Sequence, residues 1–177
     1  MMWAERALRK ALRAAEQAEV LETSKSFLRV LIENDKVTYV ESGSTGSLRV
    51  MVIKDKKIGL SRIDGLTETR VLKAVETALD SMRASKPDPD FEKLVGPKPL
   101  PAASQIFDGK IRDMGIEDLL DRVLEGVDAA EERGSVIVQG EVTLTVVRNR
   151  LINSEGVDVE YDKTGAGFSI CLAVYEG

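Results

Sequence analysis

The sequence contains no histidine among its 177 residues. Histidine is the commonest metal ligand in proteins and the side chain best suited to proton transfer near neutral pH. Its absence excludes a Ser-His-Asp triad, a Cys-His pair and a histidine-ligated zinc site within this sequence. Chemistry of its own would depend on carboxylates, lysine or the single cysteine, Cys171. The sequence therefore indicates a protein without catalytic activity, or one whose catalytic residues lie elsewhere.

Other features are scarce as well. One cysteine cannot form an intrachain disulfide, and residues 1–17 are charged throughout, unlike a signal peptide. No apolar run approaches the roughly 20 residues of a membrane helix. The net charge is -5 and the basic residues are scattered among acids, as in Lys54–Lys57. These observations predict a cytoplasmic globular protein without a nucleic-acid or membrane partner.

The N-terminal half is predicted to form a helix, a β meander and a second helix. Over residues 2–18, apolar side chains share one helical face and charged side chains the other. The period then changes to two, which predicts strands separated by turns at Asn34–Asp35, Ser42–Gly46 and Asp55–Lys56. Thr67 is the expected N-cap of the second helix. The inward stripe of that helix is expected to be Val71, Leu72, Val75, Leu79 and Met82.

The C-terminal half repeats this order after a proline-rich segment. All five prolines lie between Lys86 and Pro101, which predicts a linker arm over residues 87–114. Strands are expected at residues 136–138, 142–148, 157–161 and 168–175. Aligning Asn34 with Asn149 gives a weak internal repeat with a turn at each asparagine. A third helix is expected over residues 116–132, with an inward face formed by Ile116, Leu119, Leu120, Val123, Leu124 and Val127.

These elements predict an α+β fold in which antiparallel β meanders pack with about three amphipathic helices. The predicted parts are a helix–meander–helix half at residues 1–86, the arm at 87–114 and a helix–meander half at 115–177. Together they would form one N-terminal domain. The sequence stops at Gly177 with nothing to cover its last strand, and such edges are normally capped or paired. We therefore expect the natural chain to continue. The exposed apolar face of that strand is predicted to be Phe168, Ile170, Leu172 and Val174.

Two segments in the first half and its arm are candidate sites. Ser42–Ser47 is rich in glycine and serine, but it lacks the Gly-Lys-Ser/Thr ending of a phosphate-binding loop and precedes a strand. A structural turn is favoured there. Asp88, Asp90 and Glu92 could be paired carboxylates of a hydrolase or a cation site. Because they lie in the proline-rich arm, a solvated linker is the favoured interpretation.

Three further candidates lie near the C-terminus. Asp158, Glu160 and Asp162 alternate along one strand and could bind a cation, but a charged solvent-facing surface is favoured. Asn153–Gly156 is expected to be a tight turn. Cys171 lies in an apolar strand and is expected to be a buried core thiol, since no histidine can activate it. No catalytic, cofactor-binding or metal-binding residue is therefore assigned.

Six segments, in this order, resemble the N-terminal region of the TldD/PmbA family, whose members are also called modulators of DNA gyrase. No single segment is diagnostic, but the ordered set spans nearly the whole chain. Of the two branches of the family, the Pro-Asp-Pro-Asp segment slightly favours the PmbA branch. The segments are Ala18–Val20, Leu28–Val37, Leu48–Gly59, Leu72–Leu79, Pro87–Asp90 and Asn153–Thr164.

The resemblance implies a role in peptide proteolysis. Members of the TldD branch are zinc peptidases with a HExxxH helix downstream of this region, and the PmbA branch lacks that helix and partners the zinc-bearing subunit. No family ligand or catalytic residue maps onto this sequence. The resemblance therefore implies that this sequence is a non-catalytic N-terminal scaffold of a protein that acts on peptide substrates. That protein would form a homo- or heterodimer, and zinc would be bound in the full-length protein or in its partner. The alternative is a stand-alone peptide-binding or dimerisation module. Whether the whole protein is an enzyme stays open.

Overall fold

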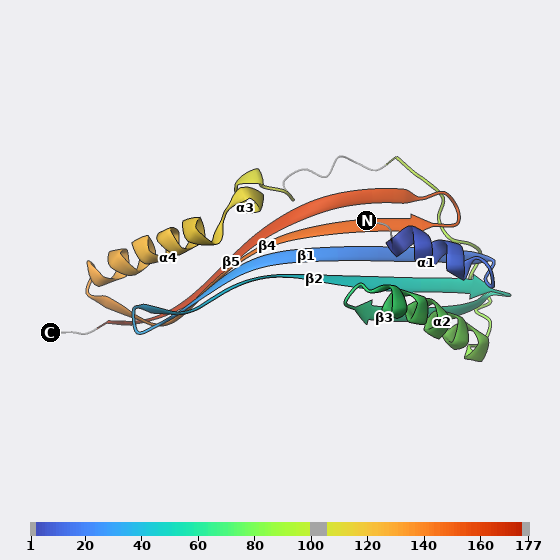
Figure 1. Cartoon of the computed structure of the whole chain (residues 1–177), viewed down its shortest axis with the longest axis horizontal. Helices are drawn as coiled ribbons and strands as arrows, with labels where there is room; N and C mark the ends of the chain where they lie inside the picture. The colour runs from blue at the N-terminus through green and yellow to red at the C-terminus, as the bar shows by residue number, and fades with distance from the viewer. Residues whose placement is uncertain (1–2, 100–105, 175–177) are drawn as a thin grey trace. The chain divides into compact units, whose positions relative to one another are not determined.

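The computed structural model describes residues 3–99 and 106–174. Five antiparallel strands form one sheet in the order β3-β2-β1-β4-β5 (Figure 1), so the predicted α+β class is confirmed. The elements are α1 Trp3–Ala11, β1 Gln17–Glu33, β2 Lys36–Lys54, β3 Lys57–Asp64, α2 Glu68–Ala84, α3 Gly109–Asp113, α4 Ile116–Glu131, β4 Ser135–Asn153 and β5 Asp158–Val174.

The chain folds as two compact units, each built from three segments. Unit 1 comprises Met1–Ser24, Thr45–Ala102 and Arg148–Tyr161, and unit 2 comprises Lys25–Ser44, Ala103–Val147 and Asp162–Gly177. The predicted division into contiguous parts at residues 86 and 115 stays a prediction, because each compact unit combines segments from different parts of the sequence.

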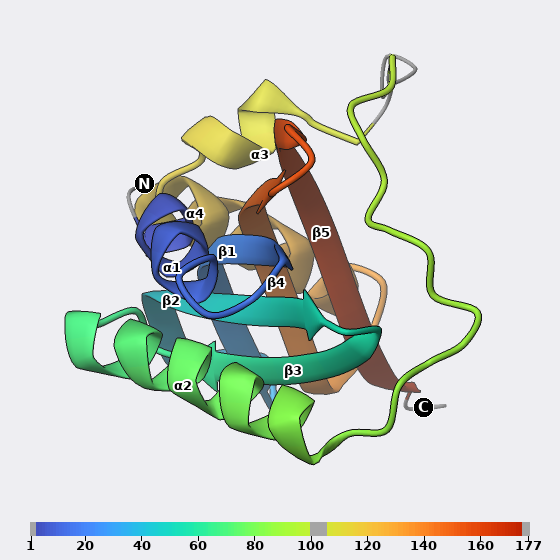
Figure 2. The same ribbon diagram turned by 90° about the vertical axis from the view of Figure 1, so that its right-hand side faces the viewer.

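The core of unit 1 lies between helices α1 and α2 and the strands beneath them (Figure 2). Alanines 4, 7 and 11 of α1 are fully buried, and their small side chains allow the helix to approach its neighbours closely. Helix α2 packs on β3, where a Cβ atom added to Gly59 would lie 2.0 Å from the Ala78 carbonyl oxygen. The core also contains Val20, Leu48, Val50, Val52, Val71, Val75 and Leu79.

The core of unit 2 is formed where α4 packs on strands β1 and β4. Leu119, Val123 and Val127 follow one another at helical spacing and are buried. They meet Val30 and Ile32 of β1, together with Ile137 and Leu144 of β4. The helix predicted at 116–132 is therefore confirmed, although Leu124 is 43% exposed and does not face inward as expected.

Local signals were predicted well. The turns at Asn34–Asp35 and Asp55–Lys56 have positive φ at both central residues, as two-residue hairpins require. Thr67 caps α2, because its hydroxyl accepts a hydrogen bond from the backbone N–H of Arg70 at 3.4 Å. Within the described residues, no helix is both long and apolar enough to cross a membrane.

The lengths of the first helix and of the strands were predicted wrongly. Helix α1 ends at Ala11 instead of residue 18, because Ala18 and Val20 are buried at alternate positions of β1. Strand β2 continues through Ser42–Gly46. The glycines are needed there for close approach: a Cβ on Gly43 would lie 2.8 Å from the Phe27 ring, and one on Gly46 2.7 Å from Leu66.

The four strands predicted near the C-terminus are two long ones, β4 and β5. No turn occurs at Asn149, which is buried within β4 and accepts a hydrogen bond from the Thr23 hydroxyl at 2.8 Å. The predicted arm is also more structured than expected, since it includes α3 and its Leu94 side chain is buried. Two positions of these predictions lie outside the described residues: Pro101, the last proline of the predicted arm, and Tyr175, the predicted end of the last strand.

Candidate functional site

The acidic residues of the proline-rich arm form a turn rather than a paired-carboxylate site. The backbone N–H of Asp90 donates to Asp88 Oδ1 at 3.0 Å, and that of Asp88 donates to the Lys56 carbonyl at 2.9 Å. The Lys56 ammonium donates to the Pro89 carbonyl. The side chains of Asp88, Asp90 and Glu92 are exposed. The turn therefore fastens the arm to the β2–β3 hairpin.

The acids of β5 in unit 1 bind arginines of the neighbouring strand. Arg150 contacts Asp158 through two hydrogen bonds of 3.0 and 2.9 Å and also binds Glu5 at 2.8 Å. Arg148 lies 3.5 Å from Glu160. The hydrogen bond from Arg150 lowers the pKa of Asp158 below its usual value. These carboxylates are engaged in cross-strand ion pairs, and Asp162 belongs to unit 2.

Asn153 shapes the β4–β5 turn. Its side-chain oxygen accepts hydrogen bonds from the N–H groups of Glu155 and Val157, both at 3.0 Å, and its amide donates to the Val95 carbonyl at 2.9 Å. The turn predicted at 153–156 is therefore confirmed. The same side chain also holds the proline-rich arm against unit 1.

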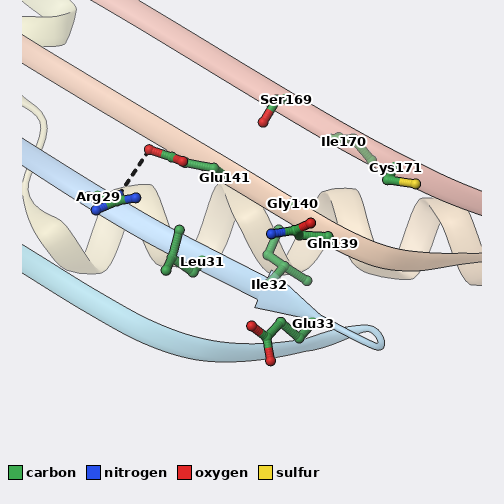
Figure 3. Close-up of a pocket in the computed structure, with 10 residues that line it drawn as sticks. All are labelled: Arg29, Leu31, Ile32, Glu33, Gln139, Gly140, Glu141, Ser169, Ile170 and Cys171. Carbon is green, nitrogen blue, oxygen red and sulfur yellow. Dashed lines mark hydrogen bonds and ion pairs between the residues drawn. The ribbon is translucent and has the colours of Figure 1, made fainter.

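A pocket of about 330 Å³ opens on the sheet in unit 2 (Figure 3). Its walls come from three strands, β1, β4 and β5, so segments far apart in sequence meet there. We call it the sheet pocket. It is lined by Arg29, Leu31, Ile32, Glu33, Gln139, Gly140, Glu141, Ser169, Ile170 and Cys171.

An ion pair between Arg29 and Glu141 lies in the sheet pocket, which Glu33 also lines. Arg29 Nε donates to Glu141 Oε1 at 2.9 Å, and the Thr143 hydroxyl donates to the same oxygen at 3.1 Å. The hydrogen bond from Arg29 is the main reason that the pKa of Glu141 lies below its ordinary value. The carboxylate is thus held in its charged form, which suits binding and positioning more than proton transfer at neutral pH.

Cys171 was expected in the core, and this prediction is wrong. The thiol is exposed at the sheet pocket. Residues 166–172 of β5 are all exposed, so neither side of the strand is covered there. The lining residues include no histidine that could form a thiol–imidazole pair. The pocket therefore lacks the usual activation of a cysteine nucleophile.

Strand β5 is the last strand of the sheet, and its C-terminal part is apolar and exposed. The exposed fractions are 79% for Phe168, 48% for Ile170, 53% for Leu172 and 69% for Val174. No charged residue occurs between Thr164 and Val174. The strand at the other end of the order, β3, instead carries charged residues, which discourage edge-to-edge pairing. The apolar edge predicted from the sequence is thus present.

Sequence reasoning missed Arg29 and Glu141. Each is a charged residue between apolar neighbours in a strand, which indicates only a solvent-facing position. The two side chains come into contact because β1 and β4 are neighbours in the sheet, although the residues are 112 positions apart in the sequence. Nothing local to either strand specifies that pairing.

Comparison with known proteins identifies the family. Residues 18–81 match the family model for PmbA/TldA metallopeptidase domain 1, and residues 109–177 match that for the PmbA/TldA metallopeptidase central domain. The chain belongs to the TldD/PmbA family. It is 27% identical over 161 residues to the uncharacterized protein MJ0231 of Methanocaldococcus jannaschii, covering 91% of this chain and 36% of that protein.

Solved structures share the fold. TldE from Thermococcus kodakarensis superposes with a TM-score of 0.86 at 19% identity, over 99% of this chain and 40% of that one. A proposed modulator of DNA gyrase from Thermotoga maritima gives 0.79 at 15% identity, over 98% and 40%. This chain therefore spans well under half the length of these family members.

The family description includes a metal, but the residues described here do not fit a metal centre. Residues 3–99 and 106–174 contain no group of three or more histidine, cysteine, aspartate or glutamate side chains that could hold one. The whole sequence has no histidine.

Proposed function

We propose that this chain is a non-catalytic scaffold of a TldD/PmbA-type metallopeptidase system that acts on peptides in the cytoplasm. In this proposal the catalytic zinc is carried by another part of a longer polypeptide or by a partner subunit of a homo- or heterodimer. Family membership and the metallopeptidase descriptions of both matching domains support it. The lack of a suitable donor set among the described residues agrees with a supporting role.

The observation that carries the proposal is the apolar edge of β5. An extended segment can add to such an edge through backbone hydrogen bonds, while side chains at alternate positions contact its own side chains. Phe168, Ile170 and Leu172 stand at alternate positions and would supply that contact. The edge would receive either an extended peptide or a strand of the partner subunit.

A matched pair of lysine substitutions tests the edge. Ile170→Lys places a charge on β5, and Leu60→Lys places one on β3, at residues of similar exposure (48% and 54%). A fluorescein-labelled peptide of alternating threonine and valine should bind wild type and Leu60→Lys alike. Ile170→Lys should weaken binding by about tenfold or more, because a charged edge disfavours strand addition. Equal binding to all three proteins would refute the role of β5.

A stand-alone peptide-binding or dimerisation module is the second candidate, and the same exposed edge favours it. The two candidates differ in what a polypeptide as long as the family members does. The scaffold proposal expects such a polypeptide, with zinc or with its partner subunit, to hydrolyse unfolded peptides. If the chain is a stand-alone module, we expect peptide binding or dimerisation at β5 and no hydrolysis under any of these conditions.

A further inference from the structure

A second surface lies on helix α1, away from β5 in the sequence. Arg6, Arg9 and Lys10, with Arg13 just beyond the helix end, occur at spacings of three and four residues, which places them on one side. Together with Leu72 of α2 they line a groove of about 320 Å³. We call it the cationic groove. Four positive side chains converge there in a chain whose net charge is -5.

Two of the four cations bind α2. Arg6 pairs with Glu68, and Lys10 binds Glu76 at 2.8 Å and the Leu72 carbonyl at 3.3 Å. These contacts fix the side of α1 that faces α2, and the hydrogen bond from Lys10 lowers the pKa of Glu76. Arg6 and Lys10 therefore have a structural role that accounts for their presence.

Arg9 and Arg13 have no such role. Their side chains are exposed and form no hydrogen bond or ion pair with any residue in the described part of the chain. The acids nearest to them in sequence are engaged elsewhere: Glu5 binds Arg150, and Glu16 accepts from the Asp55 N–H. Two guanidinium groups are thus available to an anionic ligand.

We propose that the cationic groove docks an extended acidic segment of a partner polypeptide. The helical turn continues past Ala11, because the N–H groups of Leu12 and Arg13 donate to the carbonyls of Leu8 and Lys10. The four residues from Arg9 to Arg13 therefore correspond to a rise of about 6 Å. Alternate residues of an extended chain are about 6.6 Å apart on the same side. Acids at alternate positions can therefore face both guanidinium groups, each of which matches a carboxylate in a two-pronged contact. The exposed part of Leu72 would contact the intervening residue.

Binding of two labelled peptides tests this site by fluorescence anisotropy, at about 20 mM ionic strength where screening is weak. Gly-Asp-Ser-Asp-Ser-Glu-Gly has alternating acids, and Gly-Asp-Asp-Ser-Ser-Glu-Gly has the same composition with no two acids at alternate positions. The first should bind several-fold more tightly than the second. Arg9→Gln/Arg13→Gln should weaken its binding about tenfold, as expected for the loss of two exposed charge pairs.

The matched control is Lys86→Gln/Lys93→Gln, which removes the same charge from two exposed positions of the arm that do not line the cationic groove. It should bind like wild type, and circular dichroism should show that both variants are folded. Equal binding of the two peptides, or equal loss in both variants, would reduce the site to general charge attraction and overturn the proposal. Displacement of the peptide by equimolar inorganic phosphate would overturn it as well. The site stands independently of the proposed function, since none of these results involves β5.

Discussion

Among the residues that the structure describes, Glu22 is the one acidic side chain that is fully buried, with an exposed fraction of 1%. It projects from β1 into the core of unit 1, where its Oε2 accepts a hydrogen bond from the Ala4 N–H at 2.9 Å. Ala4 lies in the first turn of α1, whose N–H groups have no partner within the helix. A carboxylate there also suits the positive end of the helix dipole. Glu22 therefore fixes where α1 begins.

Removing this contact should weaken the fold. Glu22→Ala leaves the Ala4 N–H unpaired in the core and opens a cavity, so we expect a loss of about 2–4 kcal/mol in the free energy of unfolding. Glu22→Gln keeps an oxygen acceptor and should lose less, about 1 kcal/mol. Urea denaturation of the two variants measures this. A smaller loss in Glu22→Ala than in Glu22→Gln would contradict the capping role.

The Arg29–Glu141 pair predicts a pH dependence. The pKa of Glu141 is lowered from 4.5 in the folded protein, so the folded state binds this proton less tightly than the unfolded state. The stabilisation is therefore present above the unfolded pKa and is lost as the pH falls through the lowered folded value. The difference in unfolding free energy between wild type and Glu141→Gln should shrink below pH 4.5. A difference that grows on acidification would contradict the ion pair.

At the scale of elements, glycine has two roles that the sequence does not distinguish. Gly43 and Gly46 indicated a break in the strand, yet both lie within β2, where the side chains of Phe27 and Leu66 occupy the space that a Cβ atom would take. Hairpin turns and helix caps were predictable because they depend on neighbouring residues. Strand lengths were not, since they depend on distant side chains such as Phe27. The sheet pocket was missed, and Cys171 was placed in the core, for the same reason: both depend on contacts between residues that are distant in sequence.

Glycine-to-alanine substitutions in two elements should have opposite effects. Gly59→Ala in β3 would place its Cβ 2.0 Å from the Ala78 carbonyl oxygen and 2.4 Å from the Met82 nitrogen, so α2 must move. We expect a loss of about 3 kcal/mol or more. Gly126→Ala in α4 meets no atom within 4 Å and should stabilise the helix by about 0.5–1 kcal/mol. Thermal unfolding of both variants and of wild type measures these effects. A Gly59→Ala variant as stable as wild type would refute the close packing of α2 on β3.

At the scale of the whole molecule, each unit is assembled from segments that are distant in sequence. Thr23 and Asn149 meet in unit 1 across 126 residues, and Asp35 accepts from the Ile137 N–H in unit 2 across 102. A single sequence shows the periodicity of each strand but not its neighbour in the sheet. The α+β class and the apolar face of β5 were nevertheless predictable, because composition and alternation indicate them.

We propose that this chain supports peptide hydrolysis without performing it. The most direct test is cleavage of a labelled, unfolded peptide by purified residues 1–177 with one equivalent of zinc. A polypeptide of the length of the family members, with its partner subunit, is assayed beside it. We expect hydrolysis by the longer protein and none by residues 1–177. Hydrolysis by residues 1–177 that copurifies with the chain and stops on chelation of zinc would contradict the scaffold role.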